Sequence, residues 1–284
     1  MPLALILSSY VAGSRVGGQA QALALAPLKV DPVLVPTVLF GRHPGWGAPG
    51  GAAVDSGVFE GVLEGLEAHR AFALCDVLIT GYFASPEQVA LAARTINRVR
   101  AETDRSGSYS GECVVVVDPI MGDEGPGLYV RAEVADAVAR ELVPRADWIT
   151  PNAWELARLS GIPATTPERA VAAARALGKR ALVTSVHAGD GRIGLACATP
   201  DRAVLYSHTR REGVPHGTGD LVTALFAARL IKRGEPFAAA HGAARAAAEA
   251  VEASVAWDAS ELPVVALGQR LADPSAEVEA REIA

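Results

Sequence analysis

The chain has 284 residues, of which half are hydrophobic and a fifth are charged, and its 26 basic and 32 acidic side chains give a net charge of −6. This composition supports a sizeable core and excludes a mainly disordered protein, and the acidic balance argues against nucleic acid or a membrane surface as partner. The lysines are Lys29, Lys179 and Lys232, and none stands in a P-loop string, which excludes that class of nucleotide site.

The spacing of the cysteines and the first residues of the chain indicate the cellular location of the protein. Cys75, Cys113 and Cys197 are widely spaced and form no Cys-x-x-Cys pair, which fits a reducing, cytoplasmic location. Residues 1–7 are apolar but lack a basic leading segment, so they are interpreted as a first strand and not as a signal peptide. No apolar run has the length of a transmembrane helix.

Short β-rich runs alternate with longer segments of helical period, which predicts a mostly parallel sheet flanked by helices. The expected strands are Leu3–Leu7, Val33–Phe40, Val77–Thr80, Val114–Asp118, Trp148–Thr150 and Ala181–Thr184. The expected helices are Gly18–Leu28, Val58–His69, Pro86–Glu102, Ala132–Leu142, Ala153–Ser160, Pro167–Leu177, Thr218–Arg233 and Phe237–Ala256. Arg192–Ala198 and Tyr206–Arg210 are expected to form a late antiparallel hairpin. We therefore expect a three-layer α/β/α fold in one domain over residues 1–284.

Two segments fall outside this pattern. The Gly/Pro-rich stretch 41–57 is long for a plain connection, so it is either a loop that covers a functional site or a disordered surface excursion. The tail 273–284, rich in Ala and Glu, is expected to be peripheral.

Three strand ends carry polar residues. In His216-Gly217-Thr218-Gly219-Asp220, a Gly-x-Gly that opens a helix can point bare amides at an anion, and Asp220 could take a proton beside them. Asp118 ends an apolar strand, where a carboxylate suits Mg²⁺, although Asp118 and Asp123 could also merely shape a turn. Asn152 and Glu155 follow another strand and could equally form an ordinary helix cap. Their occurrence together at one predicted sheet edge favours a joint site.

These motifs resemble the ribokinase-like superfamily and, within it, the pyridoxal kinases. The resemblance spans Leu5 to about Ala256 and is carried by Asp118-Pro119-Ile120-Met121-Gly122-Asp123 with Tyr129-Val130, by Thr150-Pro151-Asn152 with Glu155, by Gly217-Thr218-Gly219-Asp220-Leu221, and by Thr80-Gly81-Tyr82. It implies a ribokinase-like fold and the ATP-dependent phosphorylation of the 5′-hydroxymethyl group of pyridoxal, with pyridoxine and pyridoxamine as further candidate substrates. It also implies Mg²⁺, an optional monovalent cation, and a homodimer.

The resemblance also implies residue roles. Asp220 would be the general base, and the amides of Gly217, Thr218 and Gly219 would stabilise charge on the transferred phosphoryl group. Asp118 and Glu155 would organise the metal. The implied substrate contacts are Ser8, His43, Tyr82 and Asp220. The implied nucleotide contacts are Asp118, Thr150, Asn152, Glu155, Thr184, Ser185, Thr209, Gly217 and Gly219.

The chain departs from the family pattern beside the substrate. Family members often read Phe-Ser-Asn-His-Thr after the second strand, whereas this chain keeps His43 but has Pro44 in place of a threonine that can contact substrate. The first loop, 13–18, is one residue longer than usual. These changes leave the substrate preference less determined than phosphoryl transfer.

Two alternatives stay open. A hydroxymethylpyrimidine (phosphate) kinase of the same superfamily shares a glycine-rich start, but that group typically carries cysteine where this chain has Asp220. A non-catalytic protein that binds pyridoxal or its phosphate would explain the altered loop, but it would not need a base beside an anion hole.

Overall fold

The computed structural model describes residues 1–102 and 111–284. The strands of its main sheet are β1 (Leu3–Val11), β2 (Asp31–Phe40), β3 (Gly51–Ala53), β4 (Cys75–Thr80), β5 (Val114–Val117), β8 (Trp148–Ile149), β9 (Arg180–Gly189), β10 (Arg192–Ala198), β11 (Ala203–Thr209) and β12 (Glu279–Glu282). β6 (Gly122–Asp123) and β7 (Gly127–Leu128) form a separate small hairpin. The helices are α1 (Gly17–Leu25), α2 (Ser56–Ala68), α3 (Pro86–Glu102), α4 (Ala132–Ala137), α5 (Ala153–Ser160), α6 (Pro167–Ala176), α7 (Thr218–Arg233), α8 (Pro236–Ala256) and α9 (Val264–Leu267).

The main sheet has ten strands in the order β12-β11-β10-β9-β8-β5-β4-β1-β2-β3. The six strands from β9 to β2 in this order run parallel to one another. β3 at one end and β10, β11 and β12 at the other are antiparallel to their neighbours. The carboxyl ends of the parallel strands therefore lie along one edge of the sheet.

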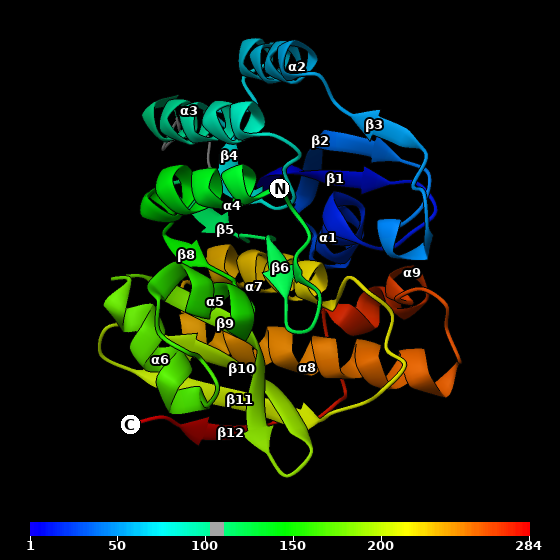
Figure 1. The fold of residues 1–284 in the computed structure, drawn as a ribbon, viewed down its shortest axis with the longest axis vertical. Coiled ribbons are helices and arrows are strands. Elements are labelled where there is room, and N and C mark those ends of the chain that lie inside the picture. The colour runs from blue at the N-terminus through cyan, green and yellow to red at the C-terminus, as the bar shows by residue number, and fades with distance from the viewer. Residues whose placement is uncertain (103–110) are drawn as a thin grey trace.

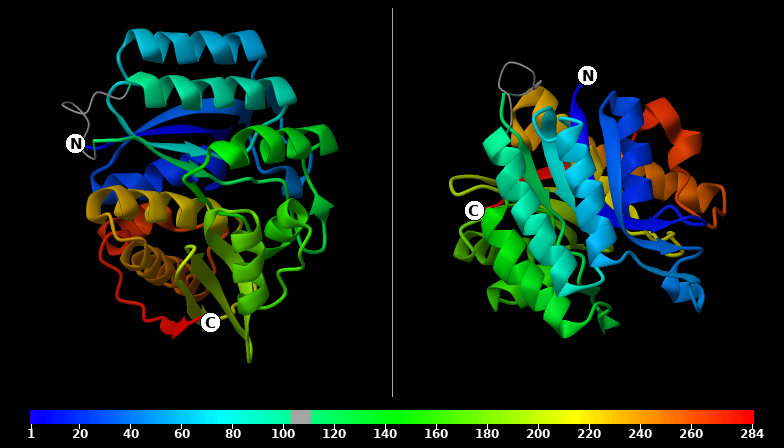
Figure 2. Two further views of the ribbon diagram at one scale, coloured as in Figure 1. Left: turned by 90° about the vertical axis from the view of Figure 1, so that its left-hand side faces the viewer. Right: turned by 90° about the horizontal axis from the view of Figure 1, so that it is seen from above.

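Helices cover both faces of the sheet and create two hydrophobic cores (Figures 1 and 2). One core lies between the sheet and α2 to α6, and the other lies between the sheet and α1, α7, α8 and α9. Successive residues of β1 face opposite cores, as the two-residue period of a strand requires: Leu5 and Leu7 enter the first, and Ala4 and Ile6 the second. The expected three-layer α/β/α fold is confirmed.

The expected elements are present with shifts at their ends, the largest at β1 and β9, which extend four and five residues beyond the expected Leu7 and Thr184. The bounds of α3, α5, α7 and β10 coincide with the prediction. The expected N-caps also form, because Ser85 accepts a hydrogen bond from the amide of Gln88 (3.3 Å) and Thr166 accepts one from the amide of Arg169 (3.3 Å). Ala132–Leu142 is helical, but its second half, Val138–Leu142, is a π-helical turn.

The sequence reading missed β3, the β6–β7 hairpin, α9 and β12. These elements are short, and the strands among them contain Gly, Ala, Glu and Arg in place of β-branched residues. β3 lies inside the 41–57 stretch and pairs with the end of β2. β12 lies inside the tail, where it forms the edge strand beside β11 and leaves the neighbouring Ile283 buried. Among the described residues, no helix is long and apolar enough to cross a membrane.

Candidate active site

Several of the predicted site residues lie at the carboxyl edge of the parallel strands. Ser8 lies near the end of β1, Tyr82 follows β4, Asp118 follows β5, and Asn152 follows β8. Thr184 lies on β9 at a register shift against β10, and it forms a parallel bridge with Asn152. α7 packs against β4 and β5 on the face of the sheet that carries the second core. Its N-terminus lies at the same edge of the sheet.

Asp220 lies in the first turn of α7. Its Oδ2 accepts a hydrogen bond from the amide of Gly17 at 2.8 Å. Its Oδ1 is buried and has no hydrogen-bond partner among the described residues. Burial raises the pKa of Asp220 to about 6, and the Gly17 amide opposes the shift. The carboxylate is therefore held at one oxygen and left available at the other.

Gly217, just before the first turn of α7, and Gly219, inside that turn, are surrounded differently. Gly217 caps α7 without a side-chain acceptor and has a φ of 102°, and a Cβ there would lie 2.3 Å from the carbonyl oxygen of Arg15. Gly217 thus allows two loops to approach closely. A Cβ on Gly219 would meet nothing within 4 Å. The space beside Gly219 is therefore open, which is compatible with an anion site at this helix N-terminus.

A chain of hydrogen bonds links α7 to two strand ends. The hydroxyl of Thr223 donates to Oδ2 of Asp118 at 2.9 Å and lies 2.8 Å from the hydroxyl of Thr150. All three side chains are buried. Thr223 follows Asp220 by three residues and therefore lies on the same side of the helix. This spacing is the signal by which the sequence could have identified Thr223, which was not among the expected site residues.

Glu155 and Asn152 form a capping box, which the sequence analysis left open as an alternative to a role in the site. The Asn152 side-chain oxygen accepts from the amide of Glu155 (2.8 Å), and Glu155 Oε2 accepts from the amide of Asn152 (2.9 Å). Glu155 Oε1 accepts from the amide of Met121 (2.8 Å), and Asn152 Nδ2 donates to the carbonyl of Gly122 (2.8 Å). The pair therefore also fixes the Met121–Gly122 turn that follows Asp118.

Three carboxyl groups at this edge hold their protons more tightly than ordinary carboxyls. Burial, and then the charges of Glu155 and Asp220, raise the pKa of Asp118 well above its usual range. Burial raises the pKa of Glu155 to about 7 against the opposing effect of three amide donors. These carboxylates repel one another, so binding of a cation between them is favoured. No group of three or more His, Cys, Asp or Glu side chains within the described ranges could hold a metal ion by itself.

The substrate side of the expected site is built around β1 and β4. The buried Ser8 hydroxyl accepts from the amide of Tyr82 at 3.3 Å. Gly81 is required there, because a Cβ would lie 2.3 Å from Ser8 Oγ. The carbonyl of Tyr82 accepts from the hydroxyl of Thr37 (2.6 Å), so the turn is also fixed to β2. Burial raises the pKa of the Tyr82 phenol, which stays neutral.

The expected nucleotide contacts on β9 and β11 are Thr184, Ser185 and Thr209, and they differ in how the structure connects them to the site. Thr184 is buried, and its amide donates to the carbonyl of Pro151 at 2.9 Å. Ser185 is exposed and has a φ of 57°, a left-handed conformation that is uncommon for a residue with a Cβ. Thr209 is exposed at the end of β11, where it pairs with Arg192. The structure therefore joins Thr184 to the site but records no such link for Thr209 within the described ranges.

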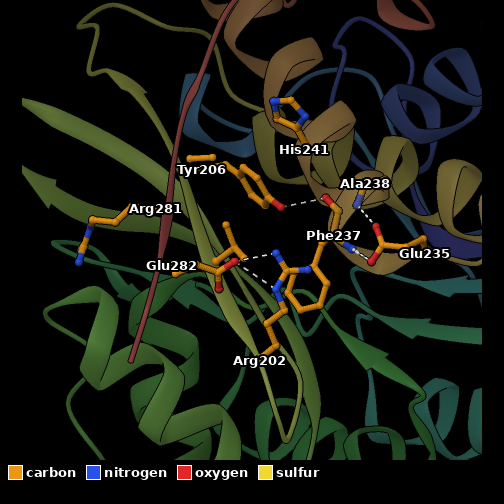
Figure 3. Close-up of a pocket in the computed structure, with 10 residues that line it drawn as sticks. Arg202, Tyr206, Glu235, Phe237, Ala238, His241, Arg281 and Glu282 are labelled. Atoms are coloured by element: carbon orange, nitrogen blue, oxygen red, sulfur yellow. Dashed lines mark hydrogen bonds and ion pairs between the residues drawn. The ribbon is translucent and has the colours of Figure 1, made fainter.

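A separate pocket of about 360 Å³ lies between β11, β12 and the start of α8 (Figure 3). Its polar groups satisfy one another: Arg202 pairs with Glu282, the Tyr206 hydroxyl donates to the carbonyl of Phe237 (3.0 Å), and Glu235 caps α8. Glu235 follows the far end of α7 and lies roughly 20 Å from Asp220, since a helix rises 1.5 Å per residue. This pocket is not part of the site at the strand ends.

Comparisons with known proteins agree with this geometry. The family model described as phosphomethylpyrimidine kinase matches residues 75–265. The pyridoxine/pyridoxal/pyridoxamine kinase of Bordetella avium is 34% identical and covers 90% of this chain and 86% of its own length. The pyridoxal kinase PdxY of Deinococcus radiodurans is 31% identical, over 81% of this chain and 79% of its own. The structure of pyridoxal kinase from Leishmania donovani with ADP and pyridoxine aligns with a TM-score of 0.90 at 25% identity, over 99% of both chains.

The α/β/α sandwich, with an uncapped helix N-terminus and carboxylates at one sheet edge, defines a small-molecule kinase of the ribokinase-like class. Within that class, the chain belongs to the pyridoxal kinase family. The resemblance found in the sequence is confirmed.

Proposed function

We propose that the protein transfers the γ-phosphoryl group of ATP to the 5′-hydroxymethyl group of pyridoxal, giving pyridoxal 5′-phosphate and ADP. The observation that carries the proposal is the arrangement at Asp220, which has one oxygen fixed by Gly17 and the other unpartnered among the described residues. Pyridoxine and pyridoxamine carry the same hydroxymethyl group and are expected to react as well.

The reaction follows from the positions of these groups. Asp220 Oδ1 takes the proton of the substrate hydroxyl as that oxygen bonds to the γ-phosphorus, while the bond between the γ-phosphorus and the oxygen of the leaving ADP breaks. The amides of Gly217, Thr218 and Gly219 face the charge that develops on the phosphoryl oxygens. With a pKa of about 6, Asp220 is mostly ionised at neutral pH, as a base must be.

Mg²⁺ fits the residues at the strand ends. Burial, and then the charges of two neighbouring carboxylates, raise the pKa of Asp118, and a divalent cation would relieve the repulsion among these groups. Asp118 would hold the ion, with Glu155 beside it, and phosphate and water oxygens would complete its coordination. The ion would neutralise charge on the nucleotide phosphates. In the protein itself, Thr223 orients Asp118, and the Met121 and Gly122 amides orient Glu155.

Phosphorylation of hydroxymethylpyrimidine is the second candidate function, because the matching family model is described as phosphomethylpyrimidine kinase. The two candidates share the phosphoryl-transfer groups and differ in the ring that is held near Ser8 and Tyr82. We favour pyridoxal because the curated relatives above 30% identity are named as vitamin B6 kinases.

A substrate panel with ATP and Mg²⁺ tests the proposal. ADP release is measured with pyridoxal, pyridoxine, pyridoxamine and hydroxymethylpyrimidine, and the products are identified by mass. Asp220→Asn should lower kcat with pyridoxal by about 10²-fold or more, the scale for a positioned general base, while pyridoxal still binds in calorimetry. Asp201→Asn, an exposed change in the β10–β11 turn, is the matched control and should leave kcat unchanged.

Two results would contradict the proposal. A preference for hydroxymethylpyrimidine over all three B6 compounds would transfer the assignment to the second candidate. Binding of pyridoxal with no turnover by the wild-type protein would favour a non-catalytic binding protein.

The homodimer and the cytoplasmic location are also proposals. The homodimer comes from the resemblance to the family, and the location comes from the three cysteines, which are free and buried. Analytical ultracentrifugation of the purified protein at micromolar concentration measures the oligomeric state.

A further inference from the structure

Two histidines from distant parts of the chain stack at the entrance to the site. His43 lies in the 41–57 stretch, just after β2, and His216 directly precedes Gly217. Their ring centroids are 4.6 Å apart and their planes differ by 17°, which is a stacked arrangement. Gly45 packs against the same pair, since a Cβ there would lie 2.9 Å from His43 Nδ1 and 3.9 Å from His216 Nε2. The 41–57 stretch (the covering loop) and the residues 216–219 at the start of α7 (the anion-hole loop) are therefore in side-chain contact.

His43 is held in a defined orientation. Its Nδ1 accepts a hydrogen bond from the amide of Gly45 at 3.1 Å, so the neutral ring carries its proton on Nε2. Burial and the neighbouring His216 lower the pKa of His43, while Glu261 opposes the shift. His43 is thus neutral at neutral pH, so its ring brings no charge into the stack.

Backbone contacts run beside the stack. The amide of Gly13 donates to the carbonyl of Gly41 at 2.9 Å, which ties the first loop to the start of the covering loop. The carboxylate of Glu261 accepts from the Ser14 hydroxyl (2.9 Å) and from the Arg15 amide (2.7 Å). The carbonyl of Arg15 in turn packs against Gly217. The first loop, residues 13–18, therefore packs against one side of the anion hole. His216 extends from the anion hole toward the covering loop.

We propose that His216 is a positioning residue, whose ring holds the covering loop, through His43, against the loop that forms the anion hole. This inference rests on the proposed function for its substrate. His216 would not contact the reacting atoms. Its effect would be to keep the ring of His43 over the bound pyridine compound. Binding of the substrate would then depend on the same loop that holds the phosphoryl group.

The kinetic test compares His216→Ala with His216→Phe. Loss of the ring should raise KM for pyridoxal roughly two- to tenfold, the factor that one stacked aromatic pair contributes, and should change kcat and the KM for ATP by less than about twofold. His216→Phe keeps a stacking ring and should restore the KM. His69→Ala, an exposed histidine at the end of α2, is the matched control.

A second measurement needs no substrate. Trp46 lies edge-on to His43, with ring centroids 6.4 Å apart and planes at 68°, and it is half exposed. The fluorescence of Trp46 is obtained as the difference between each protein and its Trp46→Phe counterpart. In ligand-free His216→Ala, acrylamide should quench Trp46 more strongly than in the wild type, and His216→Phe should restore the protection.

Each outcome decides a separate part of the inference. Unchanged quenching of Trp46 in a folded His216→Ala protein would show that His216 does not hold the loop. Increased quenching with an unchanged KM for pyridoxal would overturn the link to substrate capture. Failure of the wild type to phosphorylate any B6 compound would count against the proposed function and leave the fluorescence result to judge the contact.

Discussion

At the scale of single residues, the site is a set of carboxylates whose charge the protein leaves partly uncompensated. The sequence identified Asp118 and Asp220, because each directly follows a recognisable strand or helix boundary. It did not identify their partners. Gly17 reaches Asp220 from a position 203 residues away along the chain, and Thr223 reaches Asp118 across 105 residues. The Gly17 contact depends on the packing of α1 and α7 and has no local pattern, whereas the local signal for Thr223 is its position three residues after Asp220.

The buried charge of Asp220 should reduce stability, and Asp220→Asn should show by how much. The folded-state pKa of about 6 lies above the unfolded value near 4, so the folded protein binds more protons between these pH values. The cost of the ionised group is therefore absent below pH about 4, grows as the pH rises to about 6, and is constant above it. Asp220→Asn, which keeps the acceptor for Gly17, should be more stable than wild type at pH 7 by about 1–3 kcal/mol.

Urea unfolding of both proteins at several pH values between 4 and 8 measures this difference. Carboxyl groups away from the site are common to both proteins and cancel in the comparison. Asp118 does not cancel, because the charge of Asp220 raises its pKa, and loss of that charge should add to the difference in the same direction. A difference that does not change with pH would mean that Asp220 titrates normally.

At the scale of elements, the periodicity of the sequence located the helices and the parallel strands well. Those elements are apolar on one or both faces, and two of the helices begin at the caps Ser85 and Thr166. The short strands β3 and β12 were missed because their residues have little β propensity, and they form only through pairing with β2 and β11. The capping box at Asn152 shows that one local pattern can have two uses, since the same bonds fix the turn after Asp118.

The two glycines at the start of α7 should respond differently to alanine. Gly217→Ala requires a positive φ and places a methyl group 2.3 Å from the Arg15 carbonyl, so it should lower the free energy of unfolding by about 1–2 kcal/mol or more. Gly219→Ala meets nothing within 4 Å and should leave stability nearly unchanged. Its methyl group would stand in front of the amides and should lower kcat by about tenfold or more.

Thermal unfolding of the ligand-free proteins and steady-state kinetics separate these two effects. If Gly219→Ala lost stability while keeping full activity, the open space at the N-terminus of α7 would not be the phosphate site.

At the scale of the whole molecule, the sequence predicted the layers but not the order of the strands. Alternation of strands and helices is enough to require helices on both faces of a mostly parallel sheet. The order depends on which side each crossover returns, and β1 lies between β4 and β2 through contacts that no single segment encodes. Likewise, nothing in the Ala/Glu-rich tail indicated that it completes one end of the sheet.

The tail should therefore contribute to stability, and its buried Ile283 side chain provides the test. Ile283 is 5% exposed and belongs to the core that also contains Leu205, so Ile283→Ala should lower the free energy of unfolding by about 2 kcal/mol or more. Glu282→Ala removes only an exposed ion pair with Arg202 and should cost less than about 1 kcal/mol. Urea unfolding compares the two, and equal small losses would show that the tail is not packed on the sheet.

The hydrogen-bonded series Thr150, Thr223 and Asp118 has a consequence for how ligands leave. It joins the start of α7 to two strand ends through buried side chains, so the phosphate side of the site is built as one rigid piece. In the proposed function the 41–57 stretch would cover the pyridine side, and this stretch rests on stacked rings and a few backbone bonds. We expect it to open while the hydrogen-bonded series stays assembled. Exit of the phosphorylated vitamin and exit of the spent nucleotide are therefore expected to be separate events.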